Sequence, residues 1–334
     1  MEGAQNIVRT VNPQSYNLLN KELVIDMVIN LAVETENKKL DRELIYQSVL
    51  ELVNTPNFGF YQLSFSGETI CGMNLVTYEY NIKLSKKVIW LQTVYVDKQF
   101  RSKGVFKGLL GKLCEITRNP DDNFHNTLKL YMEKDNQTAH QVYLKSGFRV
   151  TDDILFELDF YFDKFDRNDY KTSLPSNIKL SQLSNENISF IEKEVRNSLF
   201  VDFCKSEIDS QVKEDISSHL NSIKFVVDNK NTAEVIVLAD ENTGSLIALF
   251  YIFIEYSDWR KSLFWWVDSI KVNTNHVDFF TQNMNVIIKS LVDLALIQNK
   301  CGLRIISDPK AENRWTNTCI PKSHYLILEK IVEN

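Results

Sequence analysis

The sequence predicts an α+β protein made of two tandem domains, each a mixed, mostly antiparallel sheet flanked by helices. Three observations lead to this prediction. β-Branched and aromatic runs joined by short links alternate with stretches that are apolar at helical spacing. A polar segment, residues 161–176, divides the chain near its middle. The same order of elements then recurs on its C-terminal side, which indicates a duplicated domain.

The first domain is placed at residues 1–160. Two helices come first, and Asp41 is the expected N-cap of the second. Three β-rich runs then predict an antiparallel meander. A helix, a strand and a short helix follow, and Gly147 suits the left-handed position after the last helix. The predicted helices are 23–33, 41–53, 105–116 and 138–147, and the predicted strands are 59–65, 69–81, 87–96, 127–133, 148–150 and 154–160.

The second domain is placed at residues 177–334, after a linker at 161–176 that is polar and contains Pro175. A strand and a helix opened by Ser184 precede a second meander. The predicted helices are 184–200 and 206–220, and the predicted strands are 177–183, 234–240, 245–256 and 263–272.

The two halves also match in register. TYEYN at 77–81 aligns with FIEYS at 253–257, and IWLQTVYV at 89–96 aligns with WWVDSIKV at 265–272 with the same offset. Aromatic and charged positions recur together, so we interpret the second half as a diverged copy of the first. We expect the copies to pack as an internal pseudo-dimer within a monomer rather than to form an obligate oligomer.

Bulk composition limits the possible partners. The net charge of -6 and the pI of about 5.5 argue against nucleic acid, because phosphate backbones bind basic surfaces. No apolar run is long enough to span a bilayer and the start has no apolar signal core, so we expect a cytoplasmic protein without a membrane partner. The five cysteines form no CxxC pair, which indicates reduced thiols and no metal site.

The stretch QFRSKGVF, residues 99–106, follows a strand and opens a helix. The first N–H groups of a helix have no internal partner, and the helix dipole adds partial positive charge, so such an end binds phosphate. Gly104 lets the backbone approach an anion closely, and Arg101 and Lys103 add charge. Neither a P-loop nor a dinucleotide fingerprint is present. From this stretch alone, two interpretations are equally supported: a phosphate-binding loop, and a capped helix that follows a basic turn.

A second motif, DNQTAHQVYLKSGF, occupies residues 135–148. Together with VYVDKQFRSKGVF it resembles the GNAT superfamily of acyl-CoA-dependent N-acyltransferases, over roughly residues 5–160. The segment 101–106 matches the family's (Gln/Arg)-x-x-Gly-x-(Gly/Ala) loop except at Phe106. The next family motif is matched by Asn136, Ala139, Tyr143, Gly147 and Phe148.

The resemblance implies acetyl-CoA as co-substrate and a role for each matched residue. One strand would pair its backbone with the pantetheine arm, the loop would hold the pyrophosphate, and Asn136 and Ala139 would line the coenzyme path. Tyr143 would lie near the thioester sulfur and protonate the leaving thiolate, which a phenol of pKa ~10 can do. The implied strand residues are Val94, Tyr95 and Val96, and the implied loop residues are Arg101, Ser102, Lys103, Gly104, Val105 and Phe106.

The general base is open at this stage. Many family members use a carboxylate on the fourth strand, where this chain has Gln92, which cannot accept the proton. Glu79 and Glu133 are candidates, and a solvated charge at a strand end is the alternative for both. Tyr78 and Tyr80, with Glu79 between them, indicate a pocket for a cationic amine. Gln92 and Glu133 are counted as substrate-pocket residues too.

The second half lacks the features of the loop. Its equivalent stretch, VDFFTQ at 277–282, has no glycine and no basic residue, so this half is not expected to bind coenzyme A. The leading hypothesis is an acetyl-CoA-dependent N-acetyltransferase, active in the first half, with a small primary amine as acceptor. The alternatives are a non-catalytic acyl-CoA-binding or regulatory protein, which Phe106 and Gln92 favour, and an enzyme that acetylates protein N-termini or lysines.

Overall fold

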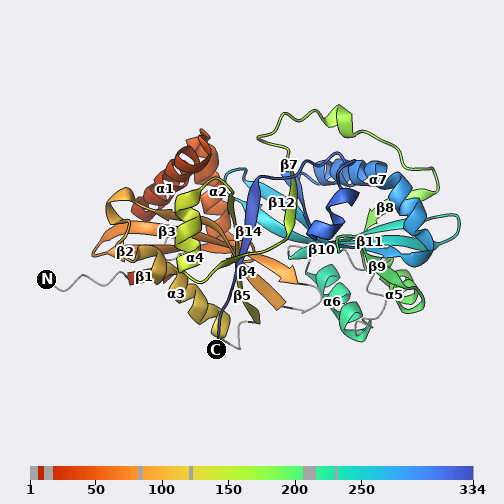
Figure 1. Cartoon of the computed structure of the whole chain (residues 1–334), viewed down its shortest axis with the longest axis horizontal. Helices are drawn as coiled ribbons and strands as arrows, with labels where there is room; N and C mark the ends of the chain where they lie inside the picture. The colour runs from red at the N-terminus through yellow and green to blue at the C-terminus, as the bar shows by residue number, and fades with distance from the viewer. Residues whose placement is uncertain are drawn as a thin grey trace.

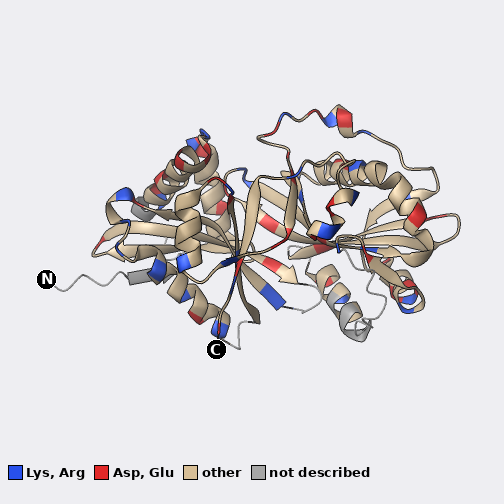
Figure 2. Cartoon of the chain, in the orientation of Figure 1, with Lys and Arg blue, Asp and Glu red and all other residues tan. Residues whose placement is uncertain are grey.

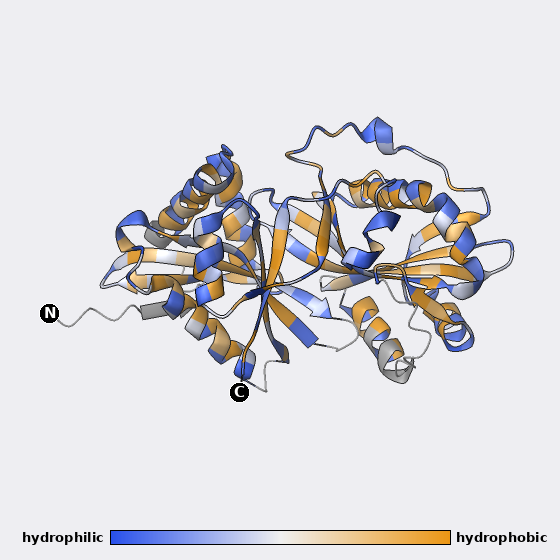
Figure 3. Cartoon of the chain, in the orientation of Figure 1, coloured by the Kyte–Doolittle hydropathy of each residue, from blue (hydrophilic) through white to orange (hydrophobic). Residues whose placement is uncertain are grey.

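The computed structural model describes residues 7–10, 18–81, 86–119, 123–205, 216–229 and 232–333. It contains two sheets with helices on both faces of each (Figure 1). The expected α+β class with mixed, mostly antiparallel sheets is confirmed. Apolar residues concentrate in the strands and on the helix faces turned toward them (Figure 3), so burial of apolar surface between the layers drives folding.

The first sheet has the strand order β1-β2-β3-β4-β5-β14-β6. β2, β3 and β4 form the expected antiparallel meander, and β5 pairs with β4 in parallel. The strands of this sheet are β1 (Ile7–Thr10), β2 (Gly59–Ser66), β3 (Thr69–Asn81), β4 (Lys86–Val96), β5 (Phe124–Glu133), β6 (Arg149–Val150) and β14 (Tyr325–Ile331).

Four helices cover the first sheet. They are α1 (Leu18–Glu36) and α2 (Arg42–Asn54) on one face, and α3 (Val105–Arg118) and α4 (Gln137–Lys145) on the other. Asp41 caps α2 as predicted, because its Oδ1 accepts from the Leu44 N–H at 2.8 Å. Gly147 has φ +85° just after α4, which also agrees with the prediction.

The second sheet has the order β7-β13-β12-β11-β10-β8, with β9 paired to β12. α5 (Ile188–Asn197) and α6 (Ile216–Asp228) pack on one face, and α7 (Val277–Ile297) packs on the other. The strands are β7 (Ile154–Asp159), β8 (Ile178–Gln182), β9 (Phe200–Asp202), β10 (Ala233–Asp240), β11 (Ser245–Ser257), β12 (Ser262–Asn273) and β13 (Gly302–Ser307).

The two meanders are built in the same register. Tyr78 opposes Ile89 in the first sheet, and their counterparts Ile254 and Trp265 oppose each other in the second. Both ladders also carry a β-bulge at the equivalent place. The tandem arrangement inferred from the sequence is therefore present in the structure.

The final strand of each half lies in the sheet of the other half. β7 precedes the linker but pairs with β13, and β14 follows all other described strands but inserts between β5 and β6 (Figure 1). Each sheet is therefore complete only with a strand from the other half. The domain division at residues 161–176 stays a prediction, and it does not describe this exchange.

The beginning of the second half differs from the prediction. α5 starts at Ile188 rather than near Ser184, because Ser184 and Asn187 first close a turn in which the Asn187 N–H bonds to the Ser184 carbonyl at 3.2 Å. The predicted end of this helix is instead the short strand β9. Most of the predicted helix 206–220 lies outside the described residues, and α6 is described from Ile216 onward.

Two further observations concern the described residues as a whole. None of their helices combines the length and apolar character needed to cross a bilayer. Lys and Arg are interspersed with Asp and Glu over both halves (Figure 2), and no group of three His, Cys, Asp or Glu side chains in the described ranges is placed to hold a metal ion.

Candidate functional site

β4 and β5 separate beyond a short shared ladder. Their parallel pairing reaches Leu91 and Leu130, and no described strand pairs with this edge of β4 afterwards. Gln92 is the extra residue of the β-bulge, so the strand bends where the pairing ends. The result is an open strand edge beside β5.

The backbone of β4 presents Val94 and Val96 to this open edge. The Asp97 N–H bonds to the Cys71 carbonyl on β3 at 3.1 Å, and alternate residues of a strand direct their peptide groups to opposite sides. Tyr95 therefore directs its backbone to β3, where it opposes Met73. The implied backbone role is corrected for Tyr95, whose hydroxyl instead lies 3.4 Å from a carboxylate oxygen of α1.

α3 begins close to the end of β4, behind the loop 101–104. Gly104 is the N-cap residue with φ +79°, and no side-chain hydrogen bond caps the helix. The N–H groups of the first turn, which include those of Val105 and Phe106, are therefore available to an anion. A Cβ at Gly104 would contact no atom, so the left-handed backbone and not crowding requires glycine. Ser102 also has positive φ, +63°.

Arg101 is turned toward α1. Its Nη2 binds Glu34 Oε2 at 2.7 Å, and its Nε donates to the Val96 carbonyl at 3.0 Å. Burial tends to raise the pKa of Glu34, but hydrogen bonds from Arg101 and Lys98 lower it overall. The charge of Arg101 is thus largely neutralised by the protein. Lys103 keeps its ammonium near the loop, 5.4 Å from the ring centre of Phe100.

Phe106 and Tyr143 meet edge to face with ring centroids 5.5 Å apart. Phe106 packs against the core between α3 and the sheet, so its ring is directed inward and does not cover the loop. Phe148 contacts Tyr143 as well, at 5.8 Å. Burial raises the pKa of Tyr143, which keeps the phenol protonated at neutral pH.

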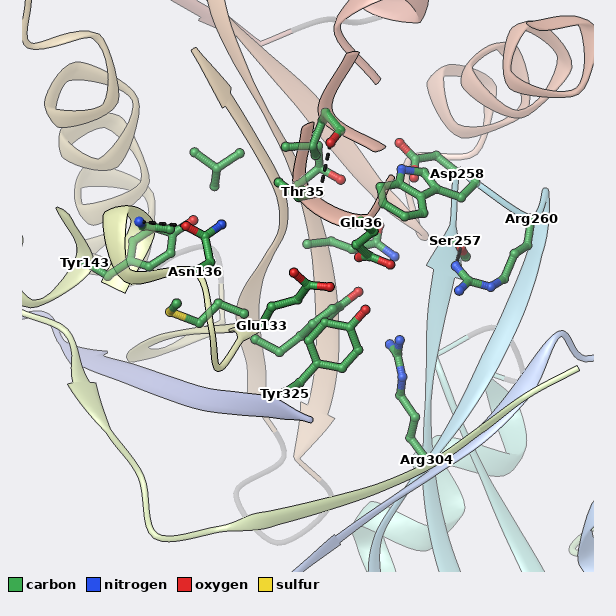
Figure 4. Close-up of a pocket in the computed structure, with 18 residues that line it drawn as sticks. Thr35, Glu36, Glu133, Asn136, Tyr143, Ser257, Asp258, Arg260, Arg304 and Tyr325 are labelled. Carbon is green, nitrogen blue, oxygen red and sulfur yellow. Dashed lines mark hydrogen bonds between the residues drawn. The ribbon is translucent and has the colours of Figure 1, made fainter. Parts of the chain in front are cut away.

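A cavity joins this region to the second half (Figure 4). Its volume of about 130 Å³ is several times what one water molecule needs. Six residues predicted from the sequence line it: Gln92, Val94, Glu133, Asn136, Ala139 and Tyr143. Six more come from beyond the linker: Ser257, Asp258, Trp259, Arg260, Arg304 and Tyr325. The cavity is therefore built by both halves.

Two carboxylates face each other in the middle of the cavity. Glu36 ends α1 and Glu133 ends β5, and Figure 4 shows their side chains converging. Burial, followed by the charge of Glu36, raises the pKa of Glu133. Lys38 binds Glu36 at 2.6 Å, and His324 Nε2 lies 3.5 Å from Glu133. A carboxylate with a raised pKa is suited to accept a proton near neutral pH.

Glu79 does not reach the cavity. Its side chain is 1% exposed and accepts hydrogen bonds from Trp90 Nε1 at 2.8 Å and Lys129 Nζ at 2.7 Å. The prediction of a catalytic role is corrected accordingly, and the alternative of a solvated charge is wrong too. Glu79 is one member of a buried ion pair, whose geometry holds β3, β4 and β5 together.

Tyr78 and Tyr80 also lie elsewhere. The Tyr78 ring packs beside Phe60 and Phe124, and the Tyr80 ring stacks on Phe225 of α6 with centroids 4.8 Å apart. Neither residue lines the cavity, so the predicted substrate pocket at this place is wrong. Because helices cover both faces of the sheet near the end of β3, its aromatic rings join apolar cores on each side.

The residues that the second half contributes to the cavity are not indicated by any motif of the sequence. Asp258 lies in the turn between β11 and β12, where it accepts from the Tyr61 hydroxyl at 2.9 Å. Burial raises the pKa of Asp258 to about 6. The sequence signal that could have indicated Asp258 is the Asp-Trp-Arg run of this turn. Charged residues in a turn are ordinarily solvated, so the run does not by itself indicate a buried site.

The two arginines of the cavity have carboxylate partners of their own. Arg260 binds Asp159 through Nε at 3.1 Å, and its Nη1 donates to the Ser257 hydroxyl at 3.0 Å. Arg304 binds Glu255 at 2.8 Å and also Glu157. Three buried or half-buried carboxylates therefore neutralise two guanidinium groups.

The equivalent gap in the second half is filled by the chain itself. β12 and β13 pair only as far as Val267 and Ile305, as β4 and β5 do at the equivalent place. There, however, β9 pairs with residues 271–273, and the Phe203 N–H donates to the Ile270 carbonyl at 2.7 Å. The edge that stays open in β4 is occupied in β12.

Comparison with known proteins agrees with this geometry. Residues 25–148 match the sequence model of the acetyltransferase (GNAT) family. A GCN5-related N-acetyltransferase from Sphaerobacter thermophilus matches with a TM-score of 0.55 and 10% identity, over 98% of this chain and 96% of its own. A tandem GNAT protein from the clavulanic acid biosynthesis pathway matches with a TM-score of 0.55 and 10% identity, over 99% of each chain.

A possible acetyltransferase from Clostridium difficile 630 is 28% identical over 42% of this chain and 88% of its own, with a TM-score of 0.38. A search of curated proteins found no match. At their low identity, the two matches over the whole chain show the fold, whereas the family match concerns the sequence of the first half. Residues 25–148 thus belong to the acetyltransferase (GNAT) family, and the chain as a whole has the fold of tandem GNAT proteins.

Proposed function

We propose that the protein is an N-acetyltransferase that transfers the acetyl group of acetyl-CoA to a primary amine, with acetyl-CoA held by the first half. One observation carries the proposal. A single cavity connects the open edge of β4 to the carboxylates Glu36 and Glu133. The first end suits a thioester on a pantetheine arm, and the second suits a cationic amine.

The residues around the open edge fit acetyl-CoA. The uncapped start of α3 behind Gly104 offers N–H groups to a pyrophosphate, and Val94 offers peptide groups to the pantetheine amides. Asn136 caps α4 by accepting from the Ala139 N–H at 3.0 Å, which fixes the entrance to the cavity beside Tyr143. Arg101 contributes to the loop by bracing it against α1 rather than by direct charge.

The reaction needs one proton acceptor and one proton donor. The ammonium first releases one proton to solvent. The neutral nitrogen then forms a bond to the acetyl carbon, the carbon–sulfur bond breaks, and the nitrogen loses a second proton. Glu133 takes this proton, since it lines the cavity and its pKa is raised. Tyr143 gives its proton to the departing thiolate and regains one from solvent; its burial keeps it protonated beforehand.

The second half is proposed not to bind coenzyme A. β9 occupies the strand edge that the pantetheine arm would need, and the turn before α7 contains no glycine. The role of this half is instead to close the acceptor end of the cavity.

The test is a pair of measurements on the full chain. Calorimetric titration with acetyl-CoA is expected to show saturable binding at one site per chain. Release of the free thiol with a panel of primary amines is then expected to follow turnover. Absence of acetyl-CoA binding would falsify the proposal, whereas binding without thiol release from any amine would favour the non-catalytic alternative that Gln92 suggests.

A further inference from the structure

Asp258 is a buried carboxylate whose hydrogen-bond donors are neutral groups. It is 1% exposed and lines the cavity, and the neutral hydroxyl of Tyr61 donates to it at 2.9 Å. No ion pair reaches it from the residues that the structure describes. Burying a charge without a counter-ion is costly, and side chains that do so at a cavity wall are candidates for binding an ion of opposite sign.

The arginines nearby are bound by other carboxylates. Arg260 lies two residues along the same turn, but its guanidinium is bound to Asp159 and Ser257. Arg304 is held by Glu255 and by a second carboxylate, and its guanidinium lies over aromatic rings. The charge of Arg260 acts on Asp258 and lowers its pKa, but both guanidinium groups are bound by other carboxylates and neither forms an ion pair with Asp258.

The cavity thus has carboxylates at two separate places. Figure 4 shows Glu36 and Glu133 together in its middle, and Asp258 apart from them on the turn beyond β11. The charge of Glu36 raises the pKa of Glu133, so these two carboxylates act on each other. An acceptor that reaches from one place to the other meets negative charge at both ends.

We infer that the acceptor carries two amino groups, one of which reacts beside Glu133 while the other, as an ammonium, binds Asp258. The inference names the acceptor class for the proposed acetyl transfer and rests on that function. Simple alkyl diamines, polyamines and other small molecules with a second ammonium group share this chemistry. Primary amines of this kind are protonated near neutral pH, so the second group keeps its charge while the first reacts.

The inference also gives the diverged second half a role. The turn that carries Asp258 is anchored in the core of the first half, because Tyr256 stacks on Phe58 with centroids 5.3 Å apart and bonds to Ser48 at 2.9 Å. This anchoring fixes the position of the turn that carries Asp258 in the cavity wall. Acceptor selection would then reside in the second half, and coenzyme binding in the first.

The test compares acceptors that differ only at the far end. Butylamine, 4-amino-1-butanol, 1,4-diaminobutane and 4-aminobutanoate are titrated into the full chain at pH 8 and followed by calorimetry. We expect 1,4-diaminobutane to bind about tenfold more tightly than butylamine or the neutral alcohol, and 4-aminobutanoate to bind weakest. Longer diamines, each paired with its alkylamine, extend the comparison if the two anionic places are further apart.

Asp258→Asn removes the charge but keeps an oxygen that can accept from Tyr61, so the fold is retained. This variant is expected to lose most of the preference for the diamine. Glu241→Gln, which changes the net charge equally at an exposed position, is expected to keep it. Three results would overturn the inference. They are equal affinity for all four compounds, a preference for 4-aminobutanoate, and a preference for the diamine that is unchanged in Asp258→Asn. Because acetyl-CoA binding and thiol release are measured separately, failure of the acetyltransferase proposal is distinguishable from failure of this inference.

Discussion

Trp90 and Trp266 lie with their ring centroids 5.0 Å apart where the two sheets meet. They occupy equivalent positions in the two copies, opposite Thr77 and Phe253. Each indole N–H donates to a buried glutamate of its own half, at 2.8 Å in the first and 2.9 Å in the second. The contact between the sheets is therefore formed by the same arrangement used twice.

The two arrangements differ in their cation. Lys129 binds the glutamate of the first copy, whereas Arg304 binds that of the second. The longer, forked guanidinium also reaches Glu157 and the cavity wall, which the lysine of the first copy does not. The cation that binds the buried glutamate is thus purely structural in the first half. In the second half, the corresponding cation also lines the cavity of the candidate site.

Gly104 is predicted to decide acetyl-CoA binding. Gly104→Glu places a negative side chain at the start of α3 and forces a residue with a Cβ into the left-handed region, so we expect loss of measurable acetyl-CoA binding by calorimetry. Gly111→Ala is the matched control within the same helix. It meets open space and should keep the affinity while raising the free energy of unfolding by about 1 kcal/mol.

Tyr143→Phe is expected to reduce kcat by about 100-fold, because the ring stays packed between Phe106 and Phe148 but the proton donor is lost. Acetyl-CoA affinity should change by less than about threefold, since no charge or backbone group is altered. Steady-state thiol release and calorimetry measure the two quantities. A variant with the full rate would remove Tyr143 as the acid while leaving the enzyme proposal intact.

Glu79→Gln is expected to affect stability rather than the reaction. It leaves the partly buried ammonium of Lys129 without its carboxylate partner, so the free energy of unfolding should fall by about 2 kcal/mol in denaturant titration. The kcat of the folded variant should stay within about twofold of the wild type. A loss of kcat without a loss of stability would restore Glu79 as a candidate base.

Asp258 is predicted to make the fold less stable as the pH rises. Its pKa is about 6 in the folded protein against a usual 3.8, because burial disfavours the charged form. The folded chain therefore holds this proton more tightly, and the associated stability, about 3 kcal/mol at most, is lost as the pH rises from 3.8 through about 6. The Tyr61 hydroxyl and the charge of Arg260 each lower the pKa of Asp258, but burial outweighs them.

Asp258→Asn should consequently raise the free energy of unfolding at pH 8 and change it little at pH 4. Urea unfolding at both values measures the difference. A lower stability of the variant at pH 8 would mean that the carboxylate supports the fold, and the case for a cation-binding role would weaken. Residues that reduce stability in the free protein are commonly kept for function.

Local patterns allowed most of the fold to be predicted. The cap at Asp41, the three-stranded meander and the helix after Gly104 each depend on residues close together in the sequence. The residues that line the cavity on β4, β5 and α4 could be named for the same reason, since they lie on nearby elements of the chain.

The acceptor end could not be predicted in this way. It combines Glu36 from α1 with Asp258 and Arg304 from the other half, and no short-range pattern relates these positions. Tyr80 and Glu79 were wrongly assigned to a substrate pocket. Their strand is buried on both faces, so its polar and aromatic side chains lie in the core, and the sequence does not distinguish such positions from those of a pocket.

The exchange of β7 and β14 has a consequence for how the chain folds during its synthesis on the ribosome. β14 is synthesised after every other described strand, yet it lies between β5 and β6 in the sheet made first. Until it emerges, β5 has an unpaired edge and the cavity lacks Tyr325. During synthesis, we therefore expect the first half to stay incompletely folded or bound to chaperones until β14 has been made. Catalytic activity is expected to appear only after β14 has joined the sheet.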